Sequence, residues 1–270
     1  MKESYFDNRI FYRTNEWRPL RTNIVFVHGV CGSSSAFWEF EKKLGDEYNI
    51  LAYDLRGHGL SKRYYEYSDY EIEKFSDDLL ELVNYLNIEK FVIISHSFGT
   101  FVSLDFIAKH QDRLIEIIFL SPHFNFSLMR KAKIARPILN LLTKIRFPIS
   151  KTKKRKQLDY LKDYPNSGDF NLRRTYADIS NTGLRPYLYV VKQIYSFDGE
   201  NILGNIHIPT LIVHGKTDTI FPVKWGISMS KKIPNSKIIL LENVCHEIKG
   251  NMTTITKITN TIEEFLKEIK

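Results

Sequence analysis

Short apolar runs alternate with longer amphipathic stretches along the first half of the chain. The runs are rich in β-branched and aromatic side chains and are bounded by Gly, Asp, Ser or Pro, as buried parallel strands are. They cover residues 24–27, 50–53, 91–94 and 115–120. Segments near Ala36–Leu44, Asp69–Leu86 and Phe98–His110 have the spacing of helices that bury one face. This alternation predicts a parallel sheet with right-handed crossovers and helices on both sides.

The alternation stops after residue 123 and resumes near residue 206. Two more strands are predicted at 210–214 and 237–241, with a helix near Val223–Lys232 between them and a last helix near Thr253–Lys270. At the front, segments 4–6 and 9–13 flank Asp7-Asn8, a pair that favours a hairpin turn. We therefore predict an α/β fold with a mostly parallel, twisted sheet of about eight strands. Residues 1–123 and 206–270 form the predicted core, and residues 124–205 form an inserted helical cap.

Composition is that of a globular protein with a single large core. The chain has 270 residues, of which 43% are hydrophobic. No apolar run reaches the ~20 residues that span a bilayer, and the polar start of the chain lacks the apolar core of a signal peptide. The two cysteines, Cys31 and Cys245, fit free thiols in a reducing compartment better than a disulfide framework. We therefore expect a cytoplasmic location.

The formal net charge of +8 is concentrated in the predicted cap. Residues 124–200 contain 16 Lys and Arg but only 6 Asp and Glu. A predicted helix over 128–149 has one apolar side, formed by Ile134, Ile138, Leu141, Leu142 and Ile145, and basic residues around it. We expect a lid helix with its apolar side over a pocket and a solvated basic side; the alternative is weak contact with an anionic membrane. No nucleic-acid-binding module accompanies this charge, so nucleic acid is not an expected partner.

A basic run, Lys151–Lys156, follows this helix, and a second cap helix is predicted near Thr182–Tyr195. The aromatic side chains of the second helix have two possible roles. They either line an apolar pocket for an acyl chain or pack into the body of the protein.

Three residues suited to nucleophilic catalysis each follow a different predicted strand. Ser97 stands at a sharp turn between a strand and a helix, where the helix N-terminus favours developing negative charge. Asp218 follows the strand at 210–214, and His246 follows the strand at 237–241. An imidazole can take the proton of an attacking serine, and a carboxylate can fix the imidazole tautomer. Alone, each residue could be a helix cap, a turn former or a surface histidine; together they favour a Ser–His–Asp triad.

Several short motifs resemble those of the α/β-hydrolase superfamily. The segment Phe26–Val30 resembles the family's strand followed by His-Gly, and Asp54–Ser61 resembles its Asp-x-Arg-Gly-x-Gly-x-Ser loop. The order serine, acid, histidine is also that of the family. The turn at Ser97 departs from G-x-S-x-G because Ser95 replaces the first glycine, although the residue stays small. Serine at position 97 disfavours the dehalogenase and epoxide-hydrolase branches, which use aspartate there.

The resemblance implies an oxyanion hole formed by the backbone N–H groups of Val30 and Phe98. We predict a serine hydrolase, esterase- or lipase-like, that cleaves small carboxylic esters with an apolar part through an acyl-enzyme on Ser97. His28, His123 and Phe221 are candidates for substrate contact, with the alternative that His28 holds a loop. His96 is expected to pack beside the nucleophile.

Other classes of chemistry lack the motifs they require. No metal is predicted, because H-E-x-x-H, C-x-x-C and EF-hand patterns are absent from the sequence. No cofactor is predicted, because no dinucleotide or P-loop fingerprint occurs. Two alternatives to ester hydrolysis stay open at this point. One is a C–C bond hydrolase or lyase that uses the same triad, and the other is a non-catalytic ligand receptor or lipid-surface binding protein on the same fold.

Overall fold

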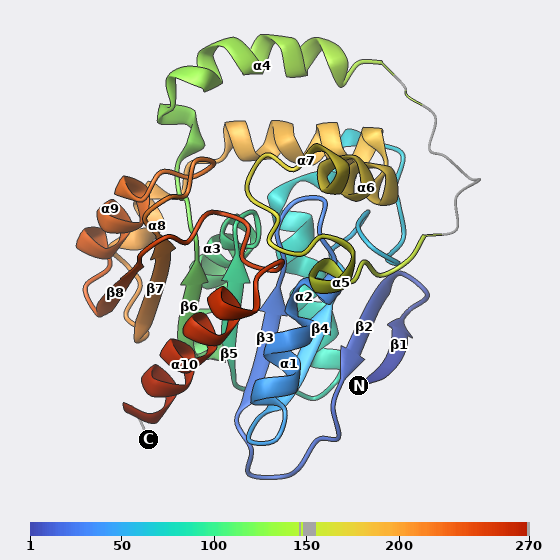
Figure 1. The fold of residues 1–270 in the computed structure, drawn as a ribbon. Helices are drawn as coiled ribbons and strands as arrows, with labels where there is room; N and C mark the ends of the chain where they lie inside the picture. The colour runs from blue at the N-terminus through green and yellow to red at the C-terminus, as the bar shows by residue number, and fades with distance from the viewer. Residues whose placement is uncertain (146, 148–154, 269–270) are drawn as a thin grey trace.

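A twisted sheet of eight strands forms the centre of the computed structural model, which describes residues 1–145, 147 and 155–268 (Figure 1). The spatial order of the strands is β1-β2-β4-β3-β5-β6-β7-β8. β1 and β2 form an antiparallel hairpin, β2 is antiparallel to β4, and the remaining neighbours are parallel. The predicted fold class is therefore confirmed. The strands are β1 (Lys2–Phe6), β2 (Ile10–Thr14), β3 (Asn23–Val27), β4 (Asn49–Tyr53), β5 (Phe91–His96), β6 (Leu114–Leu120), β7 (Thr210–Gly215) and β8 (Ser236–Leu241).

The hairpin at the front of the chain turns where the sequence predicted. Asp7 and Asn8 both have left-handed backbone angles, with φ of 47° and 51°. Asn and Asp tolerate this region better than other non-glycine residues. The N–H of Arg9 donates to the carbonyl of Phe6 at 2.9 Å and closes the turn.

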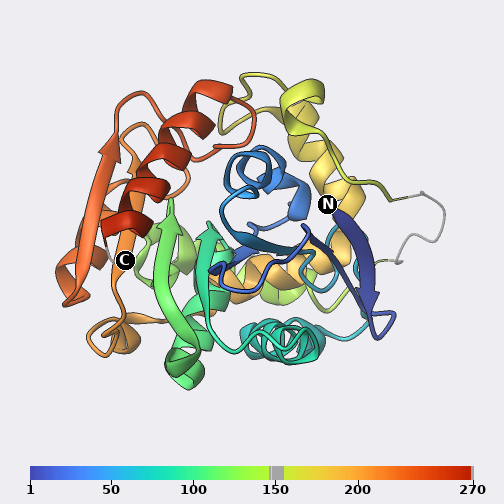
Figure 2. The same ribbon diagram turned by 90° about the horizontal axis from the view of Figure 1, so that it is seen from below.

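Helices cover both faces of the sheet (Figure 2). α1 (Trp38–Leu44) and α10 (Met252–Glu268) lie together on one face, and α2 (Ile72–Tyr85), α3 (Gly99–His110) and α9 (Lys224–Lys232) contribute to the core on the other. Alternate strand residues enter the two cores. In β3, Ile24 and Phe26 belong to the core under α1 and α10, whereas Val25 and Val27 belong to the other core. A strand that is buried on both faces has no polar alternation, which explains the continuous apolar runs in the sequence.

The segment between β6 and β7 carries the helices of the cap. They are α4 (Arg130–Leu142), α5 (Tyr160–Asp163), α6 (Leu172–Thr182), α7 (Leu184–Ser196) and α8 (Glu200–Leu203). α6 and α7 lie above the carboxyl ends of the central strands, and α4 lies farther out, against α7 (Figure 1). α4 and α7 correspond to the two predicted cap helices. Within the predicted basic run only Arg155 and Lys156 are described, and its other residues lie outside the described part of the chain.

The orientation expected for the first cap helix is wrong. Ile134, Ile138 and Leu141 are 71%, 52% and 65% exposed, and they point away from the body of the protein. The side of α4 that packs inward carries Ala132 and Leu139 instead, both of which are buried. Among the described residues, no helix is both long enough and apolar enough to cross a membrane.

Candidate active site

A strained turn between β5 and α3 presents Ser97. Its φ is 54°, in the left-handed region that a non-glycine side chain rarely adopts. The N–H of Ser97 donates to the carbonyl of Leu120, at the end of β6, at 3.2 Å. α3 begins two residues later at Gly99, where an added Cβ would lie 2.3 Å from the carbonyl oxygen of Val27. The absence of a side chain at Gly99 therefore lets the helix start close against β3 and hold the serine above the sheet.

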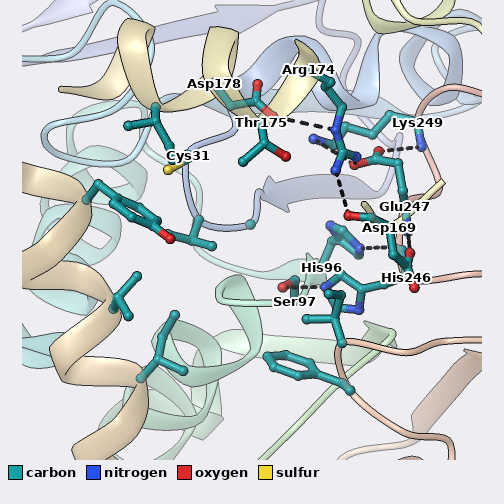
Figure 3. A pocket seen from close by; sticks show the side chains of 18 of the residues that line it. Cys31, His96, Ser97, Asp169, Arg174, Thr175, Asp178, His246, Glu247 and Lys249 are labelled. Carbon is teal, nitrogen blue, oxygen red and sulfur yellow. Dashed lines mark hydrogen bonds and ion pairs between the residues drawn. The ribbon is translucent and has the colours of Figure 1, made fainter. Parts of the chain in front are cut away.

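His246 contacts both of the other residues proposed from the sequence. Its Nε2 atom lies 2.8 Å from the Oγ atom of Ser97 (Figure 3). Its Nδ1 atom lies 2.8 Å from the Oδ2 atom of Asp218. The three residues come from loops that follow β5, β7 and β8. Because the carboxylate accepts a hydrogen bond from Nδ1–H, the proton stays on Nδ1 and the lone pair of Nε2 is free to accept the proton of the serine hydroxyl.

Asp218 is held as a carboxylate by several donors. Its Oδ1 atom accepts hydrogen bonds from the N–H groups of Ile220 (3.0 Å) and Phe221 (2.7 Å). The Nε2 atom of His214 lies 3.3 Å from Oδ2, on the same side as His246. Burial alone would raise the pKa of Asp218, but the hydrogen bonds from His214 and His246 outweigh it and hold this pKa below its usual range. The group is therefore ionised at neutral pH.

Two backbone N–H groups next to Ser97 have no hydrogen-bond acceptor in the described part of the chain. They belong to Val30, after β3, and to Phe98, which precedes α3. Val30 also lines the cavity that contains Ser97. An N–H group without an acceptor can bind an oxyanion, and that of Phe98 also carries the partial positive charge of the α3 N-terminus.

Two of the three residues expected to contact substrate lie elsewhere. His28 is fully buried; its Nδ1 atom donates to the carbonyl of Gly29 (2.8 Å) and its Nε2 atom accepts from the N–H of Leu55 (3.0 Å). His28 therefore ties two loops together, and burial lowers its pKa to about 3. His123 is also fully buried, and its ring packs on Trp225 at 4.3 Å between centroids. Neither residue lines the cavity, so the expectation of substrate contact is wrong for both.

Phe221, the third candidate, does line the cavity, with its ring centroid 4.8 Å from that of His246. His96 lies beside the nucleophile, as expected, and packs against the ring of His246. Its Nε2 atom is 3.0 Å from the carbonyl oxygen of His246. Burial lowers the pKa of His96 well below its usual value, so the ring is neutral and donates to this carbonyl.

Both thiols are free, and Cys31 lies in the cavity wall. Burial raises the pKa of Cys245 to about 11 and raises the pKa of Cys31 further. Protonated thiols are weak nucleophiles, so these cysteines are chemically quiet at neutral pH. Among the described residues, no three His, Cys, Asp or Glu side chains are grouped as metal ligands.

The cavity around Ser97 has a volume of about 260 Å³ and two different ends. One end is apolar and lies under cap helix α7. It is lined by Phe126, Ile179, Tyr187, Val191, Ile194, Tyr195, Ile220 and Phe221. The aromatic residues of α7 thus have both of the roles considered for them, because Tyr187 and Tyr195 line the cavity while Tyr189 is buried against Tyr67 and Tyr70.

The other end of the cavity is charged and joins the cap to the loop after His246 (Figure 3). Arg174 and Asp178 come from α6, and Glu247 and Lys249 come from that loop; all four are buried. Arg174 pairs with Glu247, and the Nζ atom of Lys249 lies 3.4 Å from the same carboxylate. Burial lowers the pKa of Lys249 to about 8. Sequence reasoning missed this cluster, and the i, i+4 spacing of Arg174 and Asp178 was its only local signal.

Comparisons with known proteins agree with this architecture. A family model described as alpha/beta hydrolase fold matches residues 22–250. A relative from Agrobacterium fabrum, named as a carbamate hydrolase, RutD, is 27% identical and aligns over 90% of this chain and 92% of its own. A bifunctional esterase/perhydrolase of Acinetobacter calcoaceticus is 22% identical over 85% of this chain and 86% of its own. The solved structure of MGS-M2, an alpha/beta hydrolase enzyme from a Medee basin deep-sea metagenome library, covers 98% of this chain and 97% of its own with a TM-score of 0.76 and 18% identity.

Proposed function

The chain belongs to the alpha/beta hydrolase fold family, and on that basis we propose that it is a serine hydrolase of carboxylic esters. Ser97 is the nucleophile, His246 the general base and Asp218 the partner of His246. The observation that carries the proposal is the continuous hydrogen-bonded chain Ser97–His246–Asp218 in the wall of a cavity. Similarity to a carbamate hydrolase and an esterase supports hydrolysis as the reaction class.

The proposed reaction proceeds through an acyl-enzyme. The Oγ atom of Ser97 attacks the ester carbonyl while Nε2 of His246 takes the hydroxyl proton. The negative charge that develops on the carbonyl oxygen is stabilised by the N–H groups of Val30 and Phe98. His246 then gives its proton to the leaving alcohol. In the second half, His246 deprotonates a water that attacks the acyl group and releases the acid.

The cavity favours an ester with an apolar acyl or alcohol part. Its apolar end is large enough only for a modest group, since the total volume of about 260 Å³ lies just below the usual range for ligand pockets. No part of this mechanism requires a metal or a cofactor. The free thiols Cys31 and Cys245 are in keeping with the cytoplasmic location predicted from the sequence.

The test is hydrolysis of p-nitrophenyl esters from acetyl to dodecanoyl by the wild type and by Ser97→Ala. We expect turnover of at least one ester and a loss of about three orders of magnitude or more in the variant. The preferred chain length then measures the apolar end of the cavity. Labelling of Ser97 by a fluorophosphonate probe, with His246→Ala as an unlabelled control, reads the activated serine without any assumption about the substrate.

The same experiment separates the alternatives. A C–C bond hydrolase or lyase would label with the probe at Ser97 but leave every ester in the series intact. A non-catalytic receptor would show neither labelling nor turnover, and either result would refute ester hydrolysis.

We also propose that the cap makes weak contact with anionic membranes through α4. Ile134, Ile138 and Leu141 form an exposed apolar stripe on α4, and Ile145 is exposed just beyond its end. The side chains of Lys133, within α4, and Lys144, just after it, are also exposed. A surface helix normally directs its apolar side inward, so a solvent-facing stripe favours a partner. Basic residues beside such a stripe favour anionic lipid, at ~1 kcal/mol for each charge near the surface.

The membrane proposal is tested by sedimentation with vesicles. We expect the protein to bind phosphatidylglycerol-containing vesicles, to release them as salt is raised, and to ignore phosphatidylcholine alone. Leu141→Gln should weaken binding, and Leu20→Gln, at an exposed apolar residue outside the cap, should not. Equal binding by both variants would refute the proposal. So would self-association of the wild type that Leu141→Gln abolishes, because the stripe would then cover a second copy of the chain.

A further inference from the structure

Asp169 is a cap residue that contacts both of the loops carrying the proposed acid and base. It lies in the loop before α6, at the edge of the cavity (Figure 3). Its Oδ2 atom accepts two hydrogen bonds from Thr219, from the N–H at 3.0 Å and from the hydroxyl at 2.6 Å. Its Oδ1 atom accepts a hydrogen bond from the N–H of Glu247 at 3.0 Å. One carboxylate therefore joins two loops that are distant from it in sequence.

The residues that Asp169 contacts are the immediate neighbours of the triad. Thr219 follows Asp218, and Glu247 follows His246. The N–H groups of Thr219 and Glu247 belong to the peptide bonds that follow Asp218 and His246. Hydrogen bonds to these groups therefore hold the backbone of each triad residue. Hydrogen bonds to an ionised acceptor are shorter and stronger than neutral ones, so three of them on one carboxylate make a firm link.

The loop that carries Asp169 is itself braced. Arg174, in the first turn of α6, donates from Nη2 to the carbonyl of Asp169 at 3.3 Å and pairs through its guanidinium with the carboxylate of Glu247. Asn171 caps α6 by accepting from the N–H of Arg174 at 3.0 Å. The cap therefore approaches the His246 loop through two groups that support each other.

We propose that Asp169 is a positioning residue for catalysis, which couples the placement of the cap to the geometry of the triad. This inference rests on the proposed function for its kinetic test. Asp169 touches neither Ser97 nor the imidazole, and it acts by holding the spacing between Asp218 and His246. A displacement of a reacting group by about 1 Å can cost two orders of magnitude in rate. Loss of the Asp169 carboxylate is therefore expected to lower the rate strongly if it displaces His246 or Asp218.

The variants differ in how many of the three bonds they remove. Asp169→Asn places an NH2 group against a donor N–H, while Thr219→Val removes only the hydroxyl donor and keeps the N–H. Asp163→Asn, at another cap carboxylate with no hydrogen bond to either loop in the described residues, is the matched control. We expect kcat to fall about ten- to hundredfold in Asp169→Asn, less in Thr219→Val, and not at all in Asp163→Asn.

The substrate series separates positioning from a merely structural role. If Asp169 positions the triad, kcat for the shortest and the longest esters that the wild type cleaves falls by the same factor, KM changes little, and the rate of fluorophosphonate labelling falls in parallel. If Asp169 only holds the cap, KM for the longest ester rises and the melting temperature falls, while turnover of the shortest ester and labelling stay unchanged. The second result would overturn the proposal.

A spectroscopic readout makes the test independent of any ester. The proton on Nδ1 of His246, bonded to Asp218, should give a far-downfield proton resonance that is absent in Asp218→Asn. We expect Asp169→Asn to broaden or shift this signal at neutral pH. Should the wild type cleave no ester while the signal still responds, the proposed function fails and the positioning stands; an unchanged signal refutes the positioning.

Discussion

Asp218→Asn is expected to disable His246 as the general base with almost no change in the size of any side chain. The Oδ1 atom of Asp218 already accepts from the N–H groups of Ile220 and Phe221. The asparagine must keep its oxygen at that position, so its NH2 group faces the imidazole of His246. The Nδ1 atom must then accept instead of donate, and its proton moves to Nε2. Ser97 meets an N–H where it needs a lone pair.

The expected loss follows from the tautomer. In a serine protease triad the equivalent exchange lowers kcat about 10⁴-fold with the geometry intact. At ~1.4 kcal/mol for each factor of ten, this corresponds to about 5.5 kcal/mol of transition-state stabilisation. Asp218 does not line the cavity, so substrate binding should be nearly unchanged. The loss is therefore expected in kcat, with KM within about threefold of the wild type.

The assay measures kcat and KM on the best ester of the p-nitrophenyl series, with circular dichroism to establish that the variant is folded. Asp46→Asn, at an exposed carboxylate outside this cavity, controls for the exchange itself and should be indistinguishable from the wild type. A folded Asp218→Asn variant that retains activity within tenfold of the wild type would show that another group supports His246, and the assigned roles of both residues would be wrong.

Two further predictions concern stability and are measured by urea unfolding. Gly99→Ala should destabilise the protein by about 2–3 kcal/mol or prevent folding, because the added Cβ would lie 2.3 Å from the carbonyl oxygen of Val27. Gly168→Ala, with nothing within 4 Å of the new atom, should stay within about 1 kcal/mol of the wild type. Burial lowers the pKa of Lys249 from 10.5 to about 8, so between these values the unfolded chain binds the additional proton and stability rises with pH. The free energy of unfolding of the wild type, relative to that of Lys249→Met, should therefore rise by on the order of 3 kcal/mol between pH 8 and 10.5. A difference between the two proteins that stays constant with pH would contradict the assigned burial of Lys249.

The central sheet was predictable because its signals are local. The inner parallel strands are buried on both faces, so each contains a short continuous apolar run, as at 91–94 and 211–213. The carboxyl ends of parallel strands meet at one edge of the sheet. Once the strands were recognised, the residues that follow them could be expected to lie together, and Ser97, Asp218 and His246 do so.

Helix α6 was missed because its hydrophobic pattern is reversed. Leu172 and Tyr176 are 82% and 69% exposed, whereas Arg174, Asp178 and Thr182 are buried. Periodicity assigns apolar residues to the buried face, so a helix that buries charge over a cavity has no signal that this rule can use. The reversed orientation of α4 has a similar origin, since an exposed apolar stripe and a buried one look the same in sequence.

The wrong predictions for His28 and His123 show that a position after a strand end does not fix the direction of the side chain. Both follow strands whose carboxyl ends point toward the cavity, as Ser97 does. Their side chains nevertheless turn into the body, where His28 is hydrogen-bonded to two backbone groups and His123 is enclosed by aromatic rings. The direction of a loop side chain depends on one or two backbone angles, and these are set by tertiary packing.

The position of Asp169 could not be predicted from the sequence. It lies 50 residues from Thr219 and 78 residues from Glu247, in a loop that belongs to no strand of the sheet. Nothing in the sheet topology brings it to the triad, and an acid in a polar loop is ordinary in composition. Its position depends on how α6 packs, and α6 packs by charges that periodicity does not reveal. The residues proposed for catalysis are thus predictable because the sheet places them, while the residue proposed to hold them in position depends on the cap. A change in the cap could therefore alter the rate of the reaction without any change in the triad.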